Sequence, residues 1–131
     1  DAILVGGGTW RADAPRLDVR LPGLETRSPQ RWVLTSQEAP GARTIAAPAE
    51  IARIPAQYLY VEGGAHTAAS FLEADLVDRL DIYRAPILIG GGRPALQDFG
   101  LGELAQAHGR WQPVERRNLG PDTFEAFART R

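Results

Sequence analysis

The hydrophobic residues of this chain occur in short runs separated by glycine, proline and charged residues, a pattern typical of alternating strands and helices. Residues 2–5 form one continuous apolar run, which leads into Gly6-Gly7-Gly8-Thr9. Residues 31–34 contain a second run, which ends in Thr35-Ser36. Continuous runs of this length indicate strands that are buried on both faces. We therefore predict two buried strands, each ending in small or hydroxyl-bearing residues.

The stretch of residues 58–72 joins a third predicted strand to a helix. Aromatic and aliphatic residues alternate over 58–61, whereas Ala65, Ala68, Ala69, Leu72 and Leu76 recur at helical spacing. Glu62-Gly63-Gly64 lies between them, at the carboxyl end of the strand, where open α/β sheets bind ligands. This turn is therefore the first candidate site. The alternative is that the glycines serve only the geometry of the turn and that Glu62 is a solvated surface acid.

The remaining segments complete an α/β prediction: a mostly parallel central sheet with helices on both faces and an antiparallel C-terminal strand pair. Residues 9–20 contain a proline that stops any helix and read as a segment able to wrap a ligand. Residues 37–55 read as loop with one short helix. Residues 78–86 suit a strand better than a continued helix, and 101–107 suit a short helix. Residues 111–117 and 123–129 form the predicted C-terminal pair.

Composition excludes several kinds of chemistry. The 131 residues suit a single domain, and they contain no cysteine, which removes thiolate catalysis and zinc–cysteine sites. All 15 basic residues are arginine, so there is no Schiff-base or phosphate-loop lysine. His66 and His108 are too far apart for a local metal motif, so we predict no metal site. Arg11 occupies the last position of the dinucleotide fingerprint in the first glycine-rich turn, so that turn fails it. The second turn meets only the looser form that ends in alanine, Ala95, and has no convincing second βαβ half around it.

Charge and hydropathy limit the partners. The net charge of −1 and the scattered arginines give no basic surface for nucleic acid. No apolar run is long enough to span a bilayer, and no leader resembles a signal peptide, so we expect a cytoplasmic protein. A buried strand at the first residues is unusual, and we expect further protein to precede it.

Four motifs, in order, resemble the reductase domain of the bacterial bifunctional riboflavin biosynthesis protein, a family with the dihydrofolate-reductase-like fold. They are residues 1–9 (DAILVGGGT), residues 11–20 (RADAPRLDVR), Val61-Glu62-Gly63-Gly64 with Ser70-Phe71-Leu72, and residues 85–91 (APILIGG). The resemblance covers nearly all of residues 1–131. It implies NADPH-dependent reduction of the ribosyl group of 5-amino-6-(5-phosphoribosylamino)uracil to ribityl, by direct hydride transfer.

The resemblance also implies the roles of individual residues. Leu17, Arg20 and Glu62 match substrate-binding positions, and Glu62 is the candidate catalytic residue. The residues that match cofactor-binding positions are Thr9, Asp13, Ser36, Gly63, Gly64, Ala65, His66, Thr67, Ala68, Ala69 and Ser70. The last segment agrees with the independent argument that a helix N-terminus presents free N–H groups to anions.

This sequence departs from the family pattern in two ways. Ala14 replaces a usual aspartate, and the family's first strand, with its loop and lysine, is absent from residues 1–131, as is the deaminase domain that often precedes it. Two other functions stay open: a dihydrofolate-reductase-like enzyme for another pterin or carbonyl substrate, and a non-catalytic module that binds nucleotide or only dimerises.

Two further expectations concern binding partners. Ser36, with Arg31 and Arg43 within reach of a 2′-phosphate, predicts a preference for NADPH over NADH. Trp111, Phe124 and Phe127 on terminal strands predict an apolar surface for a homodimer, which is also common in the family.

Overall fold

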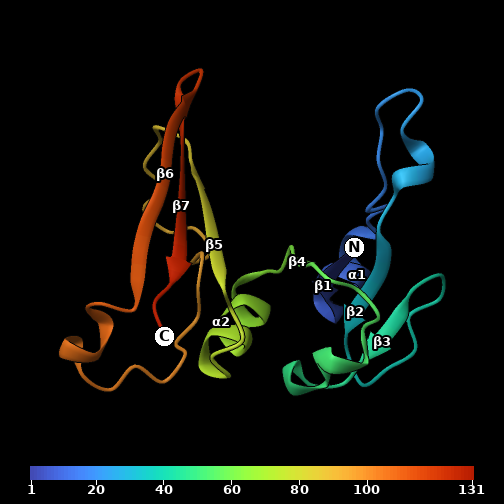
Figure 1. Cartoon of the computed structure of the whole chain (residues 1–131), viewed down its shortest axis with the longest axis horizontal. Coiled ribbons are helices and arrows are strands. Elements are labelled where there is room, and N and C mark those ends of the chain that lie inside the picture. Colours follow the sequence, from blue (N-terminus) through green and yellow to red (C-terminus); the bar gives the residue numbers. More distant parts are fainter.

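The computed structural model describes residues 1–131 and contains two sheets linked by one helix (Figure 1). Two α-helices are present, α1 (Gly7–Asp13) and α2 (Ala65–Glu73). Three short 3-10 helices are η1 (Glu25–Arg27), η2 (Pro48–Arg53) and η3 (Leu104–Ala107). The strands are β1 (Ala2–Gly6), β2 (Gln30–Leu34), β3 (Arg43–Ile45), β4 (Leu59–Val61), β5 (Arg79–Arg84), β6 (Trp111–Leu119) and β7 (Asp122–Arg129). No helix is long and apolar enough to cross a membrane.

The first sheet is parallel, in the order β3-β2-β1-β4, as the apolar runs predicted. Leu4 and Trp32 are paired in register and face the larger core cluster, which Phe71 of α2 completes. Val5 and Val33 face the opposite side, where Trp10 of α1 packs against them. Helical residues thus cover both faces of the sheet, which confirms the predicted layers.

The second sheet is antiparallel, in the order β5-β7-β6. The predicted C-terminal pair is therefore confirmed as β6 and β7. The segment over residues 78–86 is also confirmed as a strand, but β5 pairs with β7 and not with the parallel sheet. Figure 1 shows the two sheets as separate layers, with α2 between them.

Four local predictions differ from the structure. The turn after β1 is the helix α1, which ends at Ala14 in a left-handed conformation (φ 42°), just before Pro15. Residues 37–55 contain the strand β3 as well as a short helix. The helix expected over 101–107 is the 3-10 turn η3. Phe124 is buried and packs against Tyr83 in a tilted arrangement with ring centroids 4.9 Å apart, so it offers no surface to a partner.

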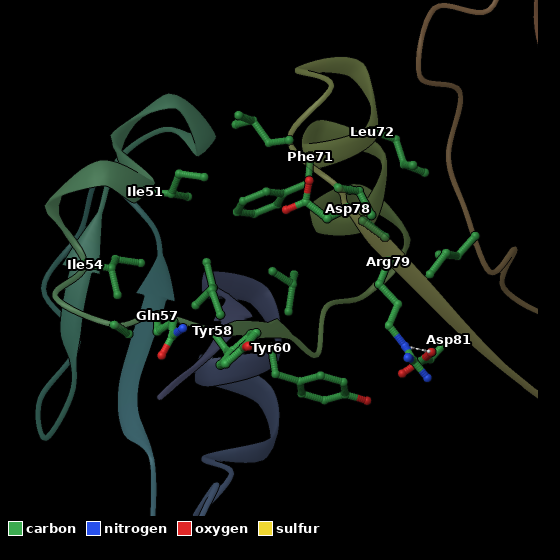
Figure 2. Close-up of a pocket in the computed structure, with 17 residues that line it drawn as sticks. Ile51, Ile54, Gln57, Tyr58, Tyr60, Phe71, Leu72, Asp78, Arg79 and Asp81 are labelled. Atoms are coloured by element: carbon green, nitrogen blue, oxygen red, sulfur yellow. Dashed lines mark hydrogen bonds and ion pairs between the residues drawn. The ribbon is translucent and has the colours of Figure 1, made fainter. Parts of the chain in front are cut away.

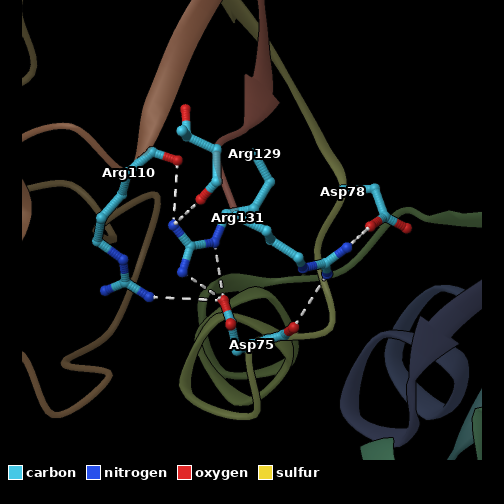
Figure 3. Close-up of polar contacts among 6 residues, drawn as sticks. Asp75, Asp78, Arg110, Arg129 and Arg131 are labelled. Atoms are coloured by element: carbon cyan, nitrogen blue, oxygen red, sulfur yellow. Dashed lines mark hydrogen bonds and ion pairs between the residues drawn. The ribbon is translucent and has the colours of Figure 1, made fainter.

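A polar cluster joins the end of α2 to the end of β7 (Figure 3). One carboxylate oxygen of Asp75 accepts bonds from Nε and Nη2 of Arg129, at 2.8 and 2.7 Å. Arg110 lies 3.8 Å from the same oxygen. Arg131 contacts the carboxylate of Asp78 and the backbone carbonyl of Asp75. The contacts of Arg129 and Arg131 tie residues that are more than 50 positions apart in sequence, such as Arg129 and Asp75 (54 positions).

The cluster predicts a pH-dependent contribution to stability. The hydrogen bond from Arg129 is the main cause that lowers the pKa of Asp75 from its ordinary 3.8. A lowered pKa stabilises the fold above the unfolded value, and this stabilisation is lost as the pH falls through the folded value. Asp75→Asn should therefore lower the Tm at pH 7, and its deficit against wild type should shrink towards pH 2. Asparagine also tolerates the left-handed backbone of Asp75 (φ 53°).

Asp78→Asn is the matched control, because the Asp78 side chain is 78% exposed and pairs only with Arg131. Its effect on the Tm should be smaller. A Tm deficit of Asp75→Asn that is equal at pH 7 and pH 2 would contradict the assigned role of the carboxylate.

Candidate functional site

Three chain segments meet at the carboxyl edge of the parallel sheet. Gly6 is in register with Leu34, and Leu4 with Val61, so β1, β2 and β4 end close together. The turn into α1, the hydroxyl-bearing segment after β2 and the Glu-Gly-Gly turn into α2 therefore lie side by side. This is the edge at which open α/β sheets bind ligands.

Thr67 of α2 packs between two of these turns. It is 8% exposed, and a Cβ added to Gly63 would lie 2.6 Å from its Cβ and 2.7 Å from its Cγ2. A Cβ added to Gly6 would overlap its hydroxyl oxygen. Glycine is therefore required in both turns because the first turn of α2 lies directly against them. Thr67 thus fills the side of both glycines on which a side chain would lie and fixes the spacing of the two turns, whereas the next residue, Gly64, is exposed.

The N-terminus of α2 offers donors to an anion at this surface. Gly64 caps the helix without any side-chain hydrogen bond, and the first N–H bonded within the helix is that of Ala68, to the carbonyl of Gly64 (3.1 Å). The N–H groups of Ala65, His66 and Thr67 thus have no partner in the helix. They add to the positive end of the helix dipole.

The rest of the predicted cofactor segment is less accessible. The N–H of Ala68 is used within the helix, Ala69 is buried, and the Ser70 hydroxyl donates to the Thr67 carbonyl at 2.8 Å. Thr9, in contrast, belongs to the edge, with its hydroxyl 3.9 Å from a Cβ built on Gly64. Asp13 is exposed at the end of α1.

The predicted substrate residues lie on two segments. Glu62 is exposed directly after β4 and makes neither an ion pair nor a side-chain hydrogen bond. Leu17, in a left-handed conformation (φ 49°), packs on the cluster around Val5 and Val33 and so anchors the segment after α1 to the sheet. Arg20 is 77% exposed, and its one ion pair is with Asp18 at 3.6 Å. No contact links Arg20 to Glu62.

Asp18 is a residue that the sequence reasoning missed. Its carboxylate lies 2.5 Å from Arg16 and 3.6 Å from Arg20. Desolvation raises the pKa of Asp18, but the hydrogen bond and charge of Arg16, with smaller contributions that include the charge of Arg20, outweigh it and leave the pKa lowered. The sequence does contain a signal for this contact: Arg16, Asp18 and Arg20 occupy every second position, and such residues share one side of an extended chain.

Two arginines lie at the wrong end of the sheet for the role we predicted. Arg31 is the second residue of β2, so Ser36 is roughly 16 Å further along the chain at about 3.3 Å per residue. Arg43 begins β3, where its guanidinium lies 5.7 Å from the Trp32 ring and donates to Gln30 at 3.2 Å. The argument for NADPH that used Arg31 and Arg43 was wrong.

An apolar cavity of about 510 Å³ lies away from this edge, between β4 and β5 (Figure 2). Thirteen of its 17 lining residues are hydrophobic, among them Leu59, Phe71, Leu72 and Leu80. Burial, with the charges of Tyr83, Glu62 and Asp81 nearby, raises the pKa of Tyr60 beside it. The sequence could not reveal this cavity, because it depends on β5 pairing with β7.

The free edge of β4 borders the cavity. The carbonyl of Tyr58 accepts from Ala2 at 2.9 Å, and the N–H of Glu62 donates to Leu4 at 2.8 Å, so these groups point to β1. Because successive residues of a strand alternate in direction, the backbone groups of Leu59 and Val61 point to the opposite edge. The backbone there has unused hydrogen-bonding capacity.

Comparisons with known proteins agree on one family. The model of the RibD C-terminal domain matches residues 49–124. The chain is 36% identical over 138 aligned residues to riboflavin biosynthesis protein RibD of Mycobacterium tuberculosis, covering 93% of this chain and 40% of that protein. It is 34% identical over 110 residues to RibD of Corynebacterium ammoniagenes, covering 70% of this chain and 33% of that protein. The chain thus spans less than half the length of these relatives.

Solved structures show the same fold. Acinetobacter baumannii RibD, form 2, superposes with a TM-score of 0.77 at 22% identity, over 98% of this chain and 47% of that one. The Thermotoga maritima diaminohydroxyphosphoribosylaminopyrimidine deaminase/5-amino-6-(5-phosphoribosylamino)uracil reductase superposes with a TM-score of 0.73 at 16% identity, over 98% of this chain and 45% of that one.

The contact of Thr67 with the two turns gives a testable prediction. Gly6→Ala should destabilise the fold by about 1 to 3 kcal/mol, the usual cost of overpacking, because its methyl overlaps the Thr67 hydroxyl. Thr67→Ala removes that hydroxyl and leaves the Thr67 Cβ 3.5 Å away, so Gly6→Ala should cost less in its presence. Urea unfolding of the four proteins measures the coupling.

Two controls belong to this cycle. Gly8→Ala should be nearly neutral, because nothing lies within 4 Å of the added methyl. Thr67→Ala should not rescue Gly63→Ala, whose methyl meets the Cβ of residue 67 itself at 2.6 Å. Additive effects of Gly6→Ala and Thr67→Ala would show that the contact does not set the spacing of the turns.

Proposed function

Because this chain belongs to the RibD C-terminal domain family, we propose that it is the reductase domain of a riboflavin biosynthesis enzyme. The domain reduces the ribosyl group of 5-amino-6-(5-phosphoribosylamino)uracil to ribityl with NADPH. The observation that carries this proposal is the meeting of three strand ends at the carboxyl edge, where Thr67 holds the turns at Gly6 and Gly63 together beside a free helix N-terminus.

The residues at this edge fit a nicotinamide dinucleotide. The N–H groups of Ala65, His66 and Thr67 suit a pyrophosphate, and the exposed Gly64 beside them has no side chain to obstruct it. Thr9 adds a hydroxyl beside Gly64. When bound, the cofactor supplies the hydride for the anomeric carbon of the ring-opened sugar.

The chain's own residues bind and orient the substrate. Glu62 is exposed and unpaired at the edge, so its carboxylate is available to hold the pyrimidine or to transfer a proton. Arg20 binds the substrate phosphate. Its side chain is 77% exposed and its guanidinium lies 3.6 Å from the Asp18 carboxylate, too far for a hydrogen bond, so a phosphate can displace this pair. The phosphorylated pyrimidine therefore meets two different segments of the chain.

Glu62→Gln tests the first role, measured in the full-length protein that carries this domain. The substitution keeps the volume and removes the charge, so NADPH-dependent turnover should fall by about a hundredfold while cofactor affinity changes little. Glu73→Gln, an exposed glutamate at the end of α2, is the matched control and should be neutral. Unchanged turnover and unchanged substrate affinity would make Glu62 a surface acid of the turn.

Arg20→Ala tests the second role. Loss of a charged hydrogen bond of roughly 1.5 to 3 kcal/mol should weaken substrate binding by about tenfold to a hundredfold, with NADPH affinity retained. Lysine should rescue only part of the loss. Arg27→Ala, in the same loop region and without an ion pair, serves as the control. A Kd for the substrate that is the same in wild type and Arg20→Ala would remove Arg20 from the site.

The same measurements separate the two alternative functions. A dihydrofolate-reductase-like enzyme for another pterin or carbonyl compound would oxidise NADPH with that compound and would not need Arg20. A non-catalytic module would bind nucleotide, or only dimerise, without turnover.

We also propose that residues 1–131 are one reductase domain that a further strand of the longer protein completes, between β4 and β5. Three observations support this: the free edge at Leu59 and Val61, the apolar cavity of about 510 Å³, and the β4–α2–β5 crossover, since such crossovers usually join parallel strands of one sheet. Hydrogen exchange of Leu59 and Val61 amides should slow in the full-length protein relative to the 131-residue chain. The outer edge of β3 is the internal control; equal exchange of β4 in both proteins would refute the proposal.

Two expectations rest on the sequence and the resemblance: a cytoplasmic location and a homodimer. The exposed apolar side chains of Ile87, Leu88, Ile89 and Val114 offer a surface for a second copy in place of the buried Phe124.

A further inference from the structure

We propose that Arg11, together with Ser36 and Gln37, forms the site that binds the 2′-phosphate of the cofactor and so selects NADPH over NADH. The inference rests on the proposed function, because it concerns one end of the same dinucleotide. It replaces Arg31 and Arg43, which lie towards the other end of the sheet, with an arginine that contacts the carboxyl edge.

Contacts place the Arg11 guanidinium beside the end of β2. Its Nη1 donates to Oε1 of Gln37 at 3.1 Å. A Cβ built on Gly7 would lie 3.0 Å from the same Nη1 and 3.0 Å from the Thr35 hydroxyl oxygen. Residues of α1 and of the segment after β2 therefore converge on one point, although Arg11 and Gln37 are 26 positions apart in sequence.

The charge of Arg11 is not neutralised by any carboxylate. Its polar partner is the amide of Gln37, which is uncharged, and the neighbouring Glu38 makes no ion pair with it. A guanidinium carries five N–H donors, so most of them stay available to an anion. Because arginine binds phosphate through two parallel hydrogen bonds, the unpaired guanidinium of Arg11 suits a phosphate group.

The hydroxyl group of Thr35 lies at the same point. The Thr35 hydroxyl oxygen accepts the N–H of Gln37 at 3.1 Å, a short turn that fixes the segment after β2. Its hydrogen remains free to donate, and the next residue, Ser36, is exposed. The site thus combines one unpaired cation with neutral donors.

The position suits the adenosine end of the cofactor. In the order β3-β2-β1-β4, β2 lies two strands from β4, whose turn leads to the free N–H groups of α2. Two strand spacings are about 10 Å, the scale of one nucleoside. A pyrophosphate at α2 therefore leaves the ribose of adenosine near Arg11, where a 2′-phosphate distinguishes NADPH from NADH.

The experiment compares the dissociation constants of NADPH and NADH, by fluorescence titration of the full-length protein. Arg11→Ala should raise the Kd for NADPH by about tenfold to a hundredfold, the factor expected for the loss of a charged hydrogen bond. The Kd for NADH should stay unchanged. Arg11→Lys should restore part of the preference. Arg43→Ala, at the amino end of β3, is the matched control and should leave both constants unchanged.

A second readout does not depend on the nicotinamide. Adenosine 2′-monophosphate should bind the wild type more tightly than adenosine 5′-monophosphate, and Arg11→Ala should abolish the difference, as measured by calorimetry. Gln37→Glu places a carboxylate against the guanidinium and should weaken the binding of adenosine 2′-monophosphate in the same way. Thermal melting identifies any variant that fails to fold, and Arg11→Lys then carries the test.

The outcomes separate the two proposals. If wild type binds both dinucleotides and Arg11→Ala leaves their ratio unchanged, the assignment of Arg11 is wrong and the reductase proposal stands. If wild type binds neither dinucleotide, both proposals are wrong.

Discussion

The contact of Thr67 with Gly6 and Gly63 is the constraint on which the site depends. It brings the first turn of α2 directly against the ends of β1 and β4, which leaves no room for a side chain in either turn. Close packing of this kind fixes position through steric exclusion, so the two turns cannot separate or slide without opening a void. The helix N–H groups, the exposed Gly64 and the carboxylate of Glu62 are therefore presented together at one edge of the sheet.

Under the proposed function, a chain without lysine binds phosphorylated ligands through other groups. Backbone N–H groups at α2 need no charged side chain to attract an anion. Guanidinium groups supply the charge elsewhere, and they differ in what already neutralises them. Arg20 shares Asp18 with Arg16, whereas Arg11 has only an amide partner. The availability of each arginine is thus set by its neighbours and not by its residue type.

The two sheets are held together by α2 and by the polar cluster around Asp75, not by hydrogen bonds between strands. Arg129, whose side chain is only 12% exposed, depends on the Asp75 carboxylate for its charge partner. Between the sheets, β4 keeps a free edge beside an apolar cavity. A hydrophobic lining next to unused backbone groups is the pattern that strand addition satisfies.

The sequence alone determined the elements whose signals are local. Continuous apolar runs predicted β1 and β2, helical spacing predicted α2, and the Glu62-Gly63-Gly64 turn marked the edge of the site. Tertiary structure decided which strands share a sheet, because pairing joins residues far apart: β5 reads as a strand but pairs with β7. It also decided which arginine lies at the carboxyl edge. The sequence does not tell that Arg11 contacts Gln37 after the end of β2, whereas Arg43 lies over Trp32. Local pattern fixes conformation, whereas the proximity of distant side chains follows only from packing.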